Sequence, residues 1–262
     1  MAEAIISRAV RLPSFDPKSI WVSDPIIEKR SHLVSTYGIQ SVESNSEAIE
    51  NAGLVFLAVK PQHFTSVATA LAGLLRIDQT IVSIMAGVTI QNLRSSLNHS
   101  KIVRVMPNTP AQVGQGASVW TSTKEVAGSA LGEISVMLDA IGYQVHVDSE
   151  DLIDAATAIS GSGPAYVFRM IEALTEAAVA LGIPSEIAKH LVEQTFFGSS
   201  LLAKESTVSA STLRQMVTSK GGTTERALEV LEEKGFESII RNAATAAYNR
   251  AKELGGNDAL NS

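Results

Sequence analysis

A nearly continuous apolar run, Gly53-Leu54-Val55-Phe56-Leu57-Ala58-Val59, lies in the first half of the chain. A strand without polar alternation is typical of a parallel sheet whose two faces are both covered by helices. Similar apolar segments follow at residues 80–85 and 101–106, and helical periodicity separates each segment from the next. Strands that alternate with helices predict an α/β fold with a doubly wound parallel sheet.

Weaker signals extend this alternation along the first half. Gly38 is expected to end one helix and Asn45 to cap the next. Right-handed crossovers between parallel strands place the loops that follow the strands along one edge, where ligands bind. The remaining expected helices are 1–10, 26–37, 46–52, 61–75, 89–97 and 124–141, and the remaining strands are 20–22, 39–42, 117–120 and 143–147.

From Asp151 onward the spacing of apolar residues is helical only. Gly161-Ser162-Gly163-Pro164 interrupts this pattern and predicts a kink or a restart of the helix. We therefore predict a first domain over residues 1–148 and a helical domain over 149–262. The helical faces carry more apolar surface than one chain covers, which predicts a homodimer or a higher homo-oligomer. A self-contained helical bundle is the alternative.

Composition excludes several classes of protein. The net charge is −6, and nucleic-acid phosphates need clustered Lys and Arg, so we expect no nucleic-acid partner. The chain has no Cys, which excludes disulfides and thiol chemistry, and its His residues lack metal-ligand spacing, so no metal is expected. No apolar stretch approaches the roughly 18 residues of a membrane span, and the first residues do not form a signal peptide. We expect a cytoplasmic protein with no membrane partner.

Asp24 follows the expected strand at 20–22 and stands just before Pro25. An acid at this place in a dinucleotide-binding sheet bonds an adenosine ribose hydroxyl. It can equally be a turn residue. Lys29 and Arg30 stand close enough in the sequence to meet a 2′-phosphate instead, which leaves NADPH and NADH both open.

Two further predicted strand ends carry a polar residue next to proline. Lys60 follows the run Gly53–Val59 and precedes Pro61, so it is either a base or phosphate ligand at the ligand edge or a solvated lysine. Asn108 lies between Pro107 and Pro110, which fix the loop and aim its amide, so we predict that it contacts the cofactor; a simple turn is the alternative.

The segment Val217–Glu225 holds two glycines, Gly221 and Gly222, just before a helix expected to begin near Thr224. Free N–H groups and the helix dipole make such a start an anion site, and Ser219, Thr223 and Thr224 add hydroxyl donors. Spacing alone favours an ordinary capped helix start over an anion site.

Taken together, five segments of the chain resemble the pyrroline-5-carboxylate reductase family, in the family's order and at similar spacing over nearly the whole chain. The last two of these segments are the most specific as a pair. The segments are Phe56–Pro61, Ala86–Ile90, Arg104–Pro110, Ile159–Tyr166 and Ser219–Thr224.

The resemblance implies reduction of a small cyclic imino acid, 1-pyrroline-5-carboxylate, to L-proline by NADPH or NADH. It also implies a dinucleotide-binding domain followed by a helical dimerisation domain. The segment Ser219–Thr224 matches the one that holds the substrate carboxylate, which implies binding by Ser219, Gly221, Gly222 and Thr223. Thr224 matches the residue that contacts the ring nitrogen, and Thr224 and Ser219 are the predicted catalytic residues. The matched cofactor contacts are Asn45, Ala58, Val59, Lys60, Pro61, Ile84, Met85 and Ala86.

The chain departs from the family at two places. Lys220 stands where the family usually has Pro. Residues 1–10 resemble the helix that follows the first strand and glycine-rich loop of the family, and this strand and loop have no counterpart in the sequence. In the strand order 3-2-1-4-5-6 that strand is central, so we expect two interior strand edges to be unpaired or to close together.

Three explanations fit this departure, namely a misassigned start, a truncated gene, and replacement of the strand by another segment. We favour the first, because the other motifs are intact. The alternatives to the reductase are a non-catalytic oligomerising homologue and, less favoured, another dinucleotide-dependent oxidoreductase such as a β-hydroxyacid dehydrogenase. That class uses a catalytic Lys in its helical domain.

Overall fold

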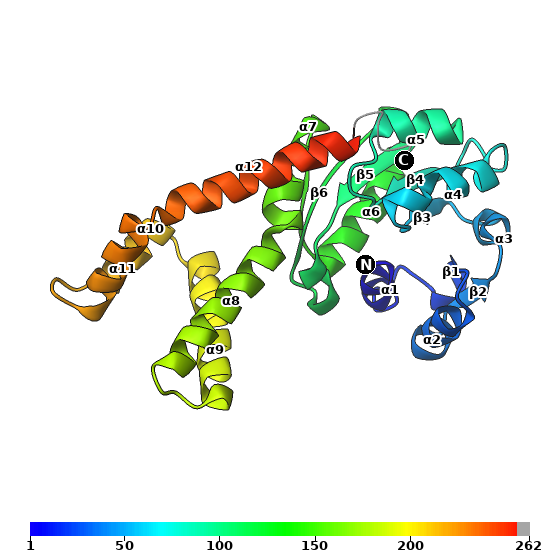
Figure 1. Cartoon of the computed structure of the whole chain (residues 1–262). Coiled ribbons are helices and arrows are strands. Elements are labelled where there is room, and N and C mark those ends of the chain that lie inside the picture. The colour runs from blue at the N-terminus through cyan, green and yellow to red at the C-terminus, as the bar shows by residue number, and fades with distance from the viewer. Residues whose placement is uncertain (256–262) are drawn as a thin grey trace. The chain divides into compact units, whose positions relative to one another are not determined.

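The computed structural model describes residues 1–255. Contacts divide the chain into two units, the first formed by residues 1–164 and the chain from Ala246 onward, the second by residues 165–245. Figure 1 shows strands and helices in the first unit and helices in the second. The division at residue 148 rests on a change in sequence pattern and stays a prediction.

Strands and helices alternate through the first unit as expected. The strands are β1 Trp21–Ser23, β2 Gln40–Val42, β3 Leu54–Leu57, β4 Thr80–Ser83, β5 Ile102–Met106, β6 Gly116–Ser122 and β7 Gly142–His146. The helices are α1 Ala2–Ala9, α2 Ile27–Tyr37, α3 Asn45–Ile49, α4 Phe64–Leu71, α5 Ile90–Leu97, α6 Gly128–Ile141 and α7 Asp151–Ala156.

The main sheet has the order β3-β4-β5-β6-β7. β3, β4 and β5 are parallel, β6 is antiparallel to β5, and β7 is parallel to β6. Successive residues of a strand point to opposite faces. Val103 and Val105 pack with residues of α1 and α6 on one face, and Ile102 packs with residues of α4 and α5 on the other. Both faces of the sheet are thus covered by helices, as the apolar strands predict.

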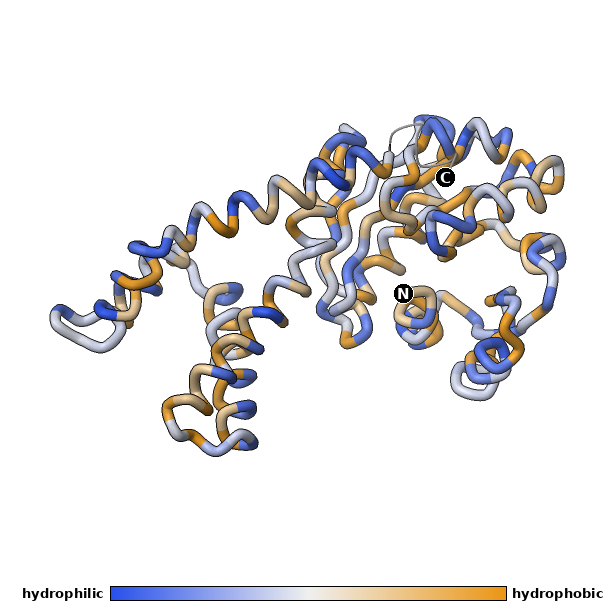
Figure 2. The backbone as a smooth tube through the Cα atoms, in the orientation of Figure 1, coloured by the Kyte–Doolittle hydropathy of each residue, from blue (hydrophilic) through white to orange (hydrophobic). Residues whose placement is uncertain are grey.

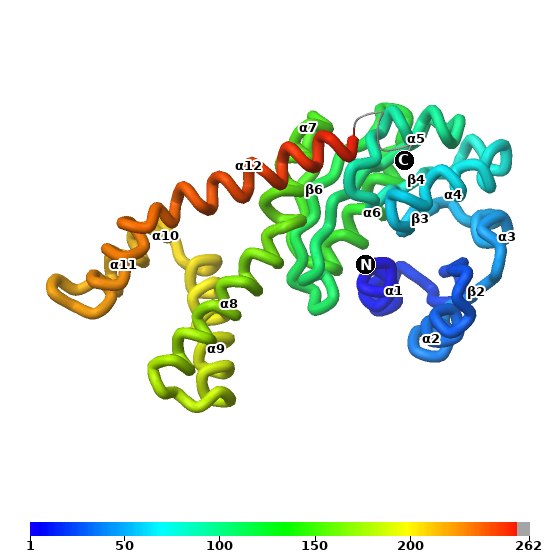
Figure 3. Tube along the Cα trace, viewed as in Figure 1, coloured from blue at the N-terminus to red at the C-terminus, as the bar shows by residue number. Residues whose placement is uncertain are grey.

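β1 and β2 form a separate parallel pair, which α3 connects to β3 along the chain (Figure 3). The carbonyl of Gly53 accepts a hydrogen bond from Thr80 N in β4, and the carbonyl of Leu57 accepts one from Ile84 N just after β4. Alternation then turns the backbone groups of Leu54 and Phe56 away from β4. Within residues 1–255 no strand pairs with this edge of β3. Of the two expected outcomes, unpaired edges are the one observed.

Burial follows from this pairing. All four residues of β4 are buried, whereas Leu54 and Phe56 of β3 are only partly buried. The expectation that the run 53–59 is buried on both faces is therefore wrong for β3, because β3 lies at the edge of its sheet.

A polar cluster ties α1 to α2, which carries the chain from β1 to β2. Glu3 Oε1 lies 2.9 Å from His32 Nε2 and accepts a hydrogen bond of 3.1 Å from the Tyr37 hydroxyl. The hydrogen bond from His32 lowers the pKa of the Glu3 carboxyl. Partial burial and the bond to Glu3 raise the pKa of Tyr37. These contacts connect the β1–β2 pair to the helix that packs on the main sheet.

Two helix ends show how local chemistry sets the boundaries. Gly38 closes α2 as predicted, in the left-handed conformation with φ 70°. The predicted cap of α3 is wrong by one residue. Ser44 has the extended backbone of an N-cap and its hydroxyl accepts from Ser46 N, whereas Asn45 is the first residue of the helix.

The chain after α7 is helical throughout the described part. One π-helical turn, Thr157–Gly161, precedes α8 Gly163–Ala180, which confirms the predicted interruption at Gly161–Pro164. The later helices are α9 Ser185–Glu205, α10 Ala210–Met216, α11 Thr223–Glu233 and α12 Phe236–Gly255.

Large apolar side chains are exposed on the helices of the second unit. Figure 2 shows hydrophobic residues recurring along the backbone of these helices. Phe168 of α8 is 57% exposed and Phe197 of α9 is 64% exposed. Isolated apolar side chains on a surface are ordinary, but a series along two helices marks a face that another chain covers. None of the helices within residues 1–255 is both long enough and apolar enough to cross a membrane.

Candidate functional site

The predicted cofactor residues lie where strands end. Ala58–Pro61 follows β3, Ile84–Ala86 follows β4, and Asn108 follows β5. Because these three strands are parallel and adjacent, the three loops lie at one edge of the main sheet. Asp24 and Asn45 follow β1 and β2 and lie at the corresponding edge of the smaller sheet.

The loop after β3 ends the strand abruptly. Lys60 has an extended backbone, and Pro61 begins a short 3-10 turn in which His63 N donates to the Lys60 carbonyl at 2.9 Å. Ala58 and Lys60 are exposed and Val59 is half-buried. The exposed backbone of this loop is available to a ligand, and the exposed Lys60 ammonium suits a phosphate or solvent equally.

The loop after β4 is more constrained. Met85 is 2% exposed and belongs to the hydrophobic core, so only its backbone can make the predicted cofactor contact. Ile84 and Ala86 are half-buried. Gly87 has φ +73°, and a Cβ there would lie 2.6 Å from Leu254 Cβ of α12. Glycine at this position therefore lets α12 approach the loop closely.

Asp24 accepts the hydrogen bond of a turn residue, and its contact with a ribose hydroxyl stays a prediction. Its Oδ1 accepts from Ile26 N at 2.9 Å, and Lys29 Nζ lies 4.0 Å from Oδ2. The guanidinium of Arg30 donates to the Asp24 carbonyl. Both cations that were candidates for a 2′-phosphate are thus gathered around one acid.

Asn45 lies beside the end of β1. The hydroxyl of Ser23 donates to Asn45 Oδ1, which fixes the orientation of the amide. This contact places a predicted cofactor residue next to the carboxyl end of β1, although Asn45 comes from the following helix.

Asn108 is engaged on both sides by protein. Its Nδ2 donates to the Ser160 carbonyl at 2.9 Å, and its Oδ1 accepts from Ala117 N of β6 at 2.8 Å. One N–H of the amide is left for a ligand.

The predicted substrate segment lies in the second unit, between α10 and α11. Gly222 is the N-cap of α11, and a Cβ there would lie 2.5 Å from Ser219 Oγ. Gly221 has φ +72°, and Gly222 N donates to the Ser219 carbonyl at 3.0 Å. The two glycines therefore let the backbone turn tightly over Ser219 before the helix begins.

Thr223 and Thr224 are the first two residues of α11, with Thr223 exposed and Thr224 half-buried. N–H groups of a first helical turn have no partner within the helix. No other residue of the part that the structure describes lies within hydrogen-bonding distance of Thr224 Oγ1. The segment thus presents backbone donors and the hydroxyls of Thr223 and Thr224, for which no side-chain hydrogen bond is seen among the described residues, in the same turn.

Glu225 is a participant that the sequence interpretation did not assign. Its Oε2 accepts from Gly221 N at 2.6 Å. The available signal was its spacing, because an acid at the third helical position commonly reaches back to the N–H groups before the helix. An anion bound at this helix start has to share these donors with the Glu225 carboxylate.

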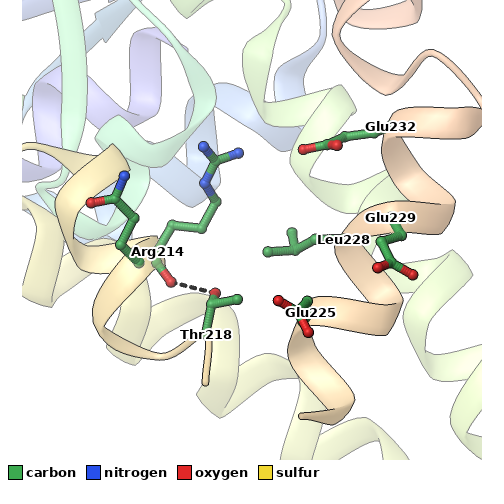
Figure 4. A pocket seen from close by; sticks show the side chains of 7 residues that line it. Arg214, Thr218, Glu225, Leu228, Glu229 and Glu232 are labelled. Carbon is green, nitrogen blue, oxygen red and sulfur yellow. Dashed lines mark hydrogen bonds between the residues drawn. The ribbon is translucent and has the colours of Figure 1, made fainter. Parts of the chain in front are cut away.

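A shallow groove runs between α10 and α11 beside this segment (Figure 4). The carboxylates of Glu225, Glu229 and Glu232 lie along one side of α11, and Arg214 faces them from α10. Thr218 Oγ1 donates to the Arg214 carbonyl at 2.7 Å, which ties the segment to the end of α10. On the acidic side Glu229 Oε2 pairs with Arg226 Nη1 at 2.6 Å, and Arg214 adds a second cation across the groove.

Comparison with known proteins now adds to this geometry. The family model described as pyrroline-5-carboxylate reductase dimerisation matches residues 150–254, and the model described as NADP oxidoreductase coenzyme F420-dependent matches residues 1–87. The pyrroline-5-carboxylate reductase of Synechocystis is 40% identical over 255 residues, 97% of this chain and 95% of the relative. That of Escherichia coli is 36% identical over 97% of this chain and 94% of the relative.

Solved structures give the same result. The pyrroline-5-carboxylate reductase of Coxiella burnetii has a TM-score of 0.87 at 36% identity, over 97% of this chain and 95% of that one. The pyrroline carboxylate reductase of Plasmodium falciparum with NADP bound has a TM-score of 0.86 at 30% identity, over 97% of this chain and 94% of that one.

Proposed function

The chain belongs to the pyrroline-5-carboxylate reductase family, and from this membership we propose that it reduces 1-pyrroline-5-carboxylate to L-proline with NADPH or NADH. The observation in the site that carries the proposal is the free hydroxyl of Thr224, in the same turn as the backbone donors that follow Gly221 and Gly222. A small imino acid needs both a carboxylate site and a donor to its ring nitrogen.

The residues at the strand ends fit a dinucleotide. Backbone exposed after β3 at Ala58 and Lys60 supports contact with the cofactor, as does the oriented amide of Asn45 beside β1. The other proposed cofactor contacts are Val59, Pro61, Ile84, Met85 and Ala86, of which Met85 acts through its backbone. When bound, the reduced nicotinamide supplies the hydride.

The chain's own residues bind the substrate and deliver a proton. We assign the carboxylate to Ser219 and to the N–H group of Thr223, where the helix dipole favours an anion. The N–H groups of Gly221 and Gly222 join them when the carboxylate displaces their present acceptors, Glu225 Oε2 and the Ser219 carbonyl. Hydride adds to the carbon of the C=N bond, whose π electrons pass to nitrogen, and nitrogen ends as a protonated amine. Thr224 Oγ donates a hydrogen bond to that nitrogen and relays its proton, so no strong base is required.

Assembly and location complete the proposal. The dimerisation model covers residues 150–254, and the exposed apolar side chains of α8 and α9 support a homodimer or a higher homo-oligomer. The net charge of −6 supports a protein without a nucleic-acid partner. We place the protein in the cytoplasm, where a pathway enzyme for an amino acid meets its cofactor.

One observation favours a second candidate, a non-catalytic oligomerising homologue. Leu54 and Phe56 of β3 turn backbone groups to an edge that no described strand covers, at the side of the sheet where a dinucleotide binds.

An initial-rate assay separates the two candidates. Oxidation of NADPH that depends on added imine, with proline formed in equal amount, supports the reductase. A folded oligomer without this activity supports the non-catalytic homologue.

A further inference from the structure

The π-helical turn Thr157–Gly161 interrupts the helical chain just before α8. Ser162 N donates to the Thr157 carbonyl at 2.8 Å, which is the wide hydrogen bond of a π turn. Single π turns within helices are rare and are frequent at functional sites, because they need compensation from their surroundings. The contacts that hold this turn in place are therefore candidates for a functional role.

Arg104 anchors the helix that leads into the turn. Its side chain is 1% exposed, and its two Nη atoms donate to Glu150 Oε1 at 2.8 Å and Asp154 Oδ1 at 2.7 Å. Glu150 also accepts from Ile90 N at 2.8 Å, at the start of α5. A guanidinium on β5 thus fixes α7 at two points.

Asn108 and Met106 hold the turn itself. Asn108 Nδ2 donates to the Ser160 carbonyl, while Ala117 N of β6 donates to the Asn108 Oδ1 and locks the amide orientation. A Cβ on Gly161 would lie 2.7 Å from Met106 Cε, so the turn approaches the end of β5 at glycine distance. The Asn108 amide and the Met106 side chain thus contact two adjacent residues of the turn, Ser160 and Gly161.

Arg104 and Met106 stand two residues apart in β5, and Asn108 continues the same spacing just beyond it. Alternate residues of a strand point to one face, so all three reach the same side. Their shared target is the stretch from α7 to the π turn. The carboxyl end of β5 lies next to that of β4, whose following loop carries proposed cofactor contacts.

We propose that Arg104, Met106 and Asn108 form a clamp that positions the π turn beside the cofactor edge of the sheet. The inference rests on the proposed reductase function. It makes Asn108 a positioning residue, acting through Ser160 and Gly161, in place of the direct cofactor contact expected from the sequence. Displacement of reacting groups by about 1 Å can lower a rate by about 10²-fold, so a displaced turn lowers kcat.

Asn108→Asp tests the amide. The carboxylate keeps the acceptor for Ala117 N but loses the donor and faces the Ser160 carbonyl oxygen. We expect exchange of the Ser162 amide hydrogen to accelerate about tenfold or more, while amides of β4 keep their protection. We expect kcat to fall about tenfold or more, with a smaller change in KM for the imine. The matched control is Asn51→Asp, which changes an exposed amide outside the clamp.

Gly161→Ala tests the same turn from the other side, should the aspartate variant fold poorly. The added Cβ meets Met106 Cε and shifts the turn, so kcat falls, and the double variant with Met106→Ala recovers part of the loss. Such recovery distinguishes positioning from a general loss of stability.

Unchanged exchange at Ser162 together with wild-type kcat in Asn108→Asp overturns the clamp. Faster exchange with wild-type kcat overturns its positioning role. A double variant no better than Gly161→Ala overturns the Met106 contact. If the wild-type chain reduces no imine, the proposed function has failed, and the exchange measurement alone then decides whether the clamp holds the turn.

Discussion

Thr224→Ala separates catalysis from helix capping. From the sequence alone, a helix cap is the alternative role for this residue, and removal of a cap destabilises a protein by about 1 kcal/mol. The structure excludes that role, because Gly222 is the N-cap and Thr224 is the second helical residue, with a hydroxyl that bonds no described protein atom. Alanine is the better helix former by a few tenths of a kcal/mol, so the melting temperature is expected to stay the same or to rise slightly.

The kinetic effect is expected to be large. A general acid contributes about 10²- to 10⁴-fold to a rate, and a hydrogen bond alone contributes less. We therefore expect kcat to fall at least about tenfold, or about 1.4 kcal/mol of transition-state stabilisation. The KM for the imine should change less, because Ser219 and the backbone donors still bind the carboxylate. Thr224→Ser keeps the hydroxyl and should keep most of kcat.

Steady-state kinetics and thermal melts on the same preparations provide the assay. Thr69→Ala is the matched control, since it removes an exposed helical hydroxyl whose partner is the Thr65 carbonyl of its own helix. A lowered melting temperature with unchanged kcat in Thr224→Ala would refute the reasoning and remove Thr224 from the catalytic residues.

Three further expectations follow from the fold. NADPH should bind this chain with a Kd above the micromolar range, because the β3 edge at the dinucleotide side is unpaired. Titration by cofactor fluorescence measures the Kd, and a micromolar value would contradict the expectation. Phe197→Glu should shift the protein towards monomer in light scattering, because it charges an exposed apolar face, and an unchanged mass would place the interface elsewhere. Arg104→Met should lower the free energy of unfolding by about 3–5 kcal/mol in denaturant titration, because it removes the buried cation that the carboxylates of Glu150 and Asp154 share, and a loss below about 1 kcal/mol would contradict the buried pairing.

Local patterns predicted most of the fold. The apolar segments at 54–57, 80–83 and 102–106 are strands because such runs are stable only where helices cover a sheet. Gly38 ends α2 because a left-handed residue there favours glycine. The cap of α3 was misplaced because Ser44 and Asn45 are both good caps, and only the backbone conformation chooses between them.

Contacts distant in sequence were not predictable. Asn108 bonds Ser160 across 52 residues, and nothing near either residue signals that pair. The ion pairs of Arg104 with Glu150 and Asp154 are equally remote in sequence. Met85 lies at a predicted strand end, yet only the packed core shows that its side chain is unavailable to a cofactor. Glu225 is the exception, because its capping-box spacing was present in the sequence.

Transfer of deuterium tests the central claim most directly. The protein is given NADPH that carries deuterium at the transferable position of the nicotinamide, together with 1-pyrroline-5-carboxylate, and the product is analysed by mass spectrometry and NMR. We expect proline with one deuterium on the ring carbon next to nitrogen that does not bear the carboxylate. Proline without deuterium, or no proline from a folded oligomer, would contradict the assignment of this chain as the reductase.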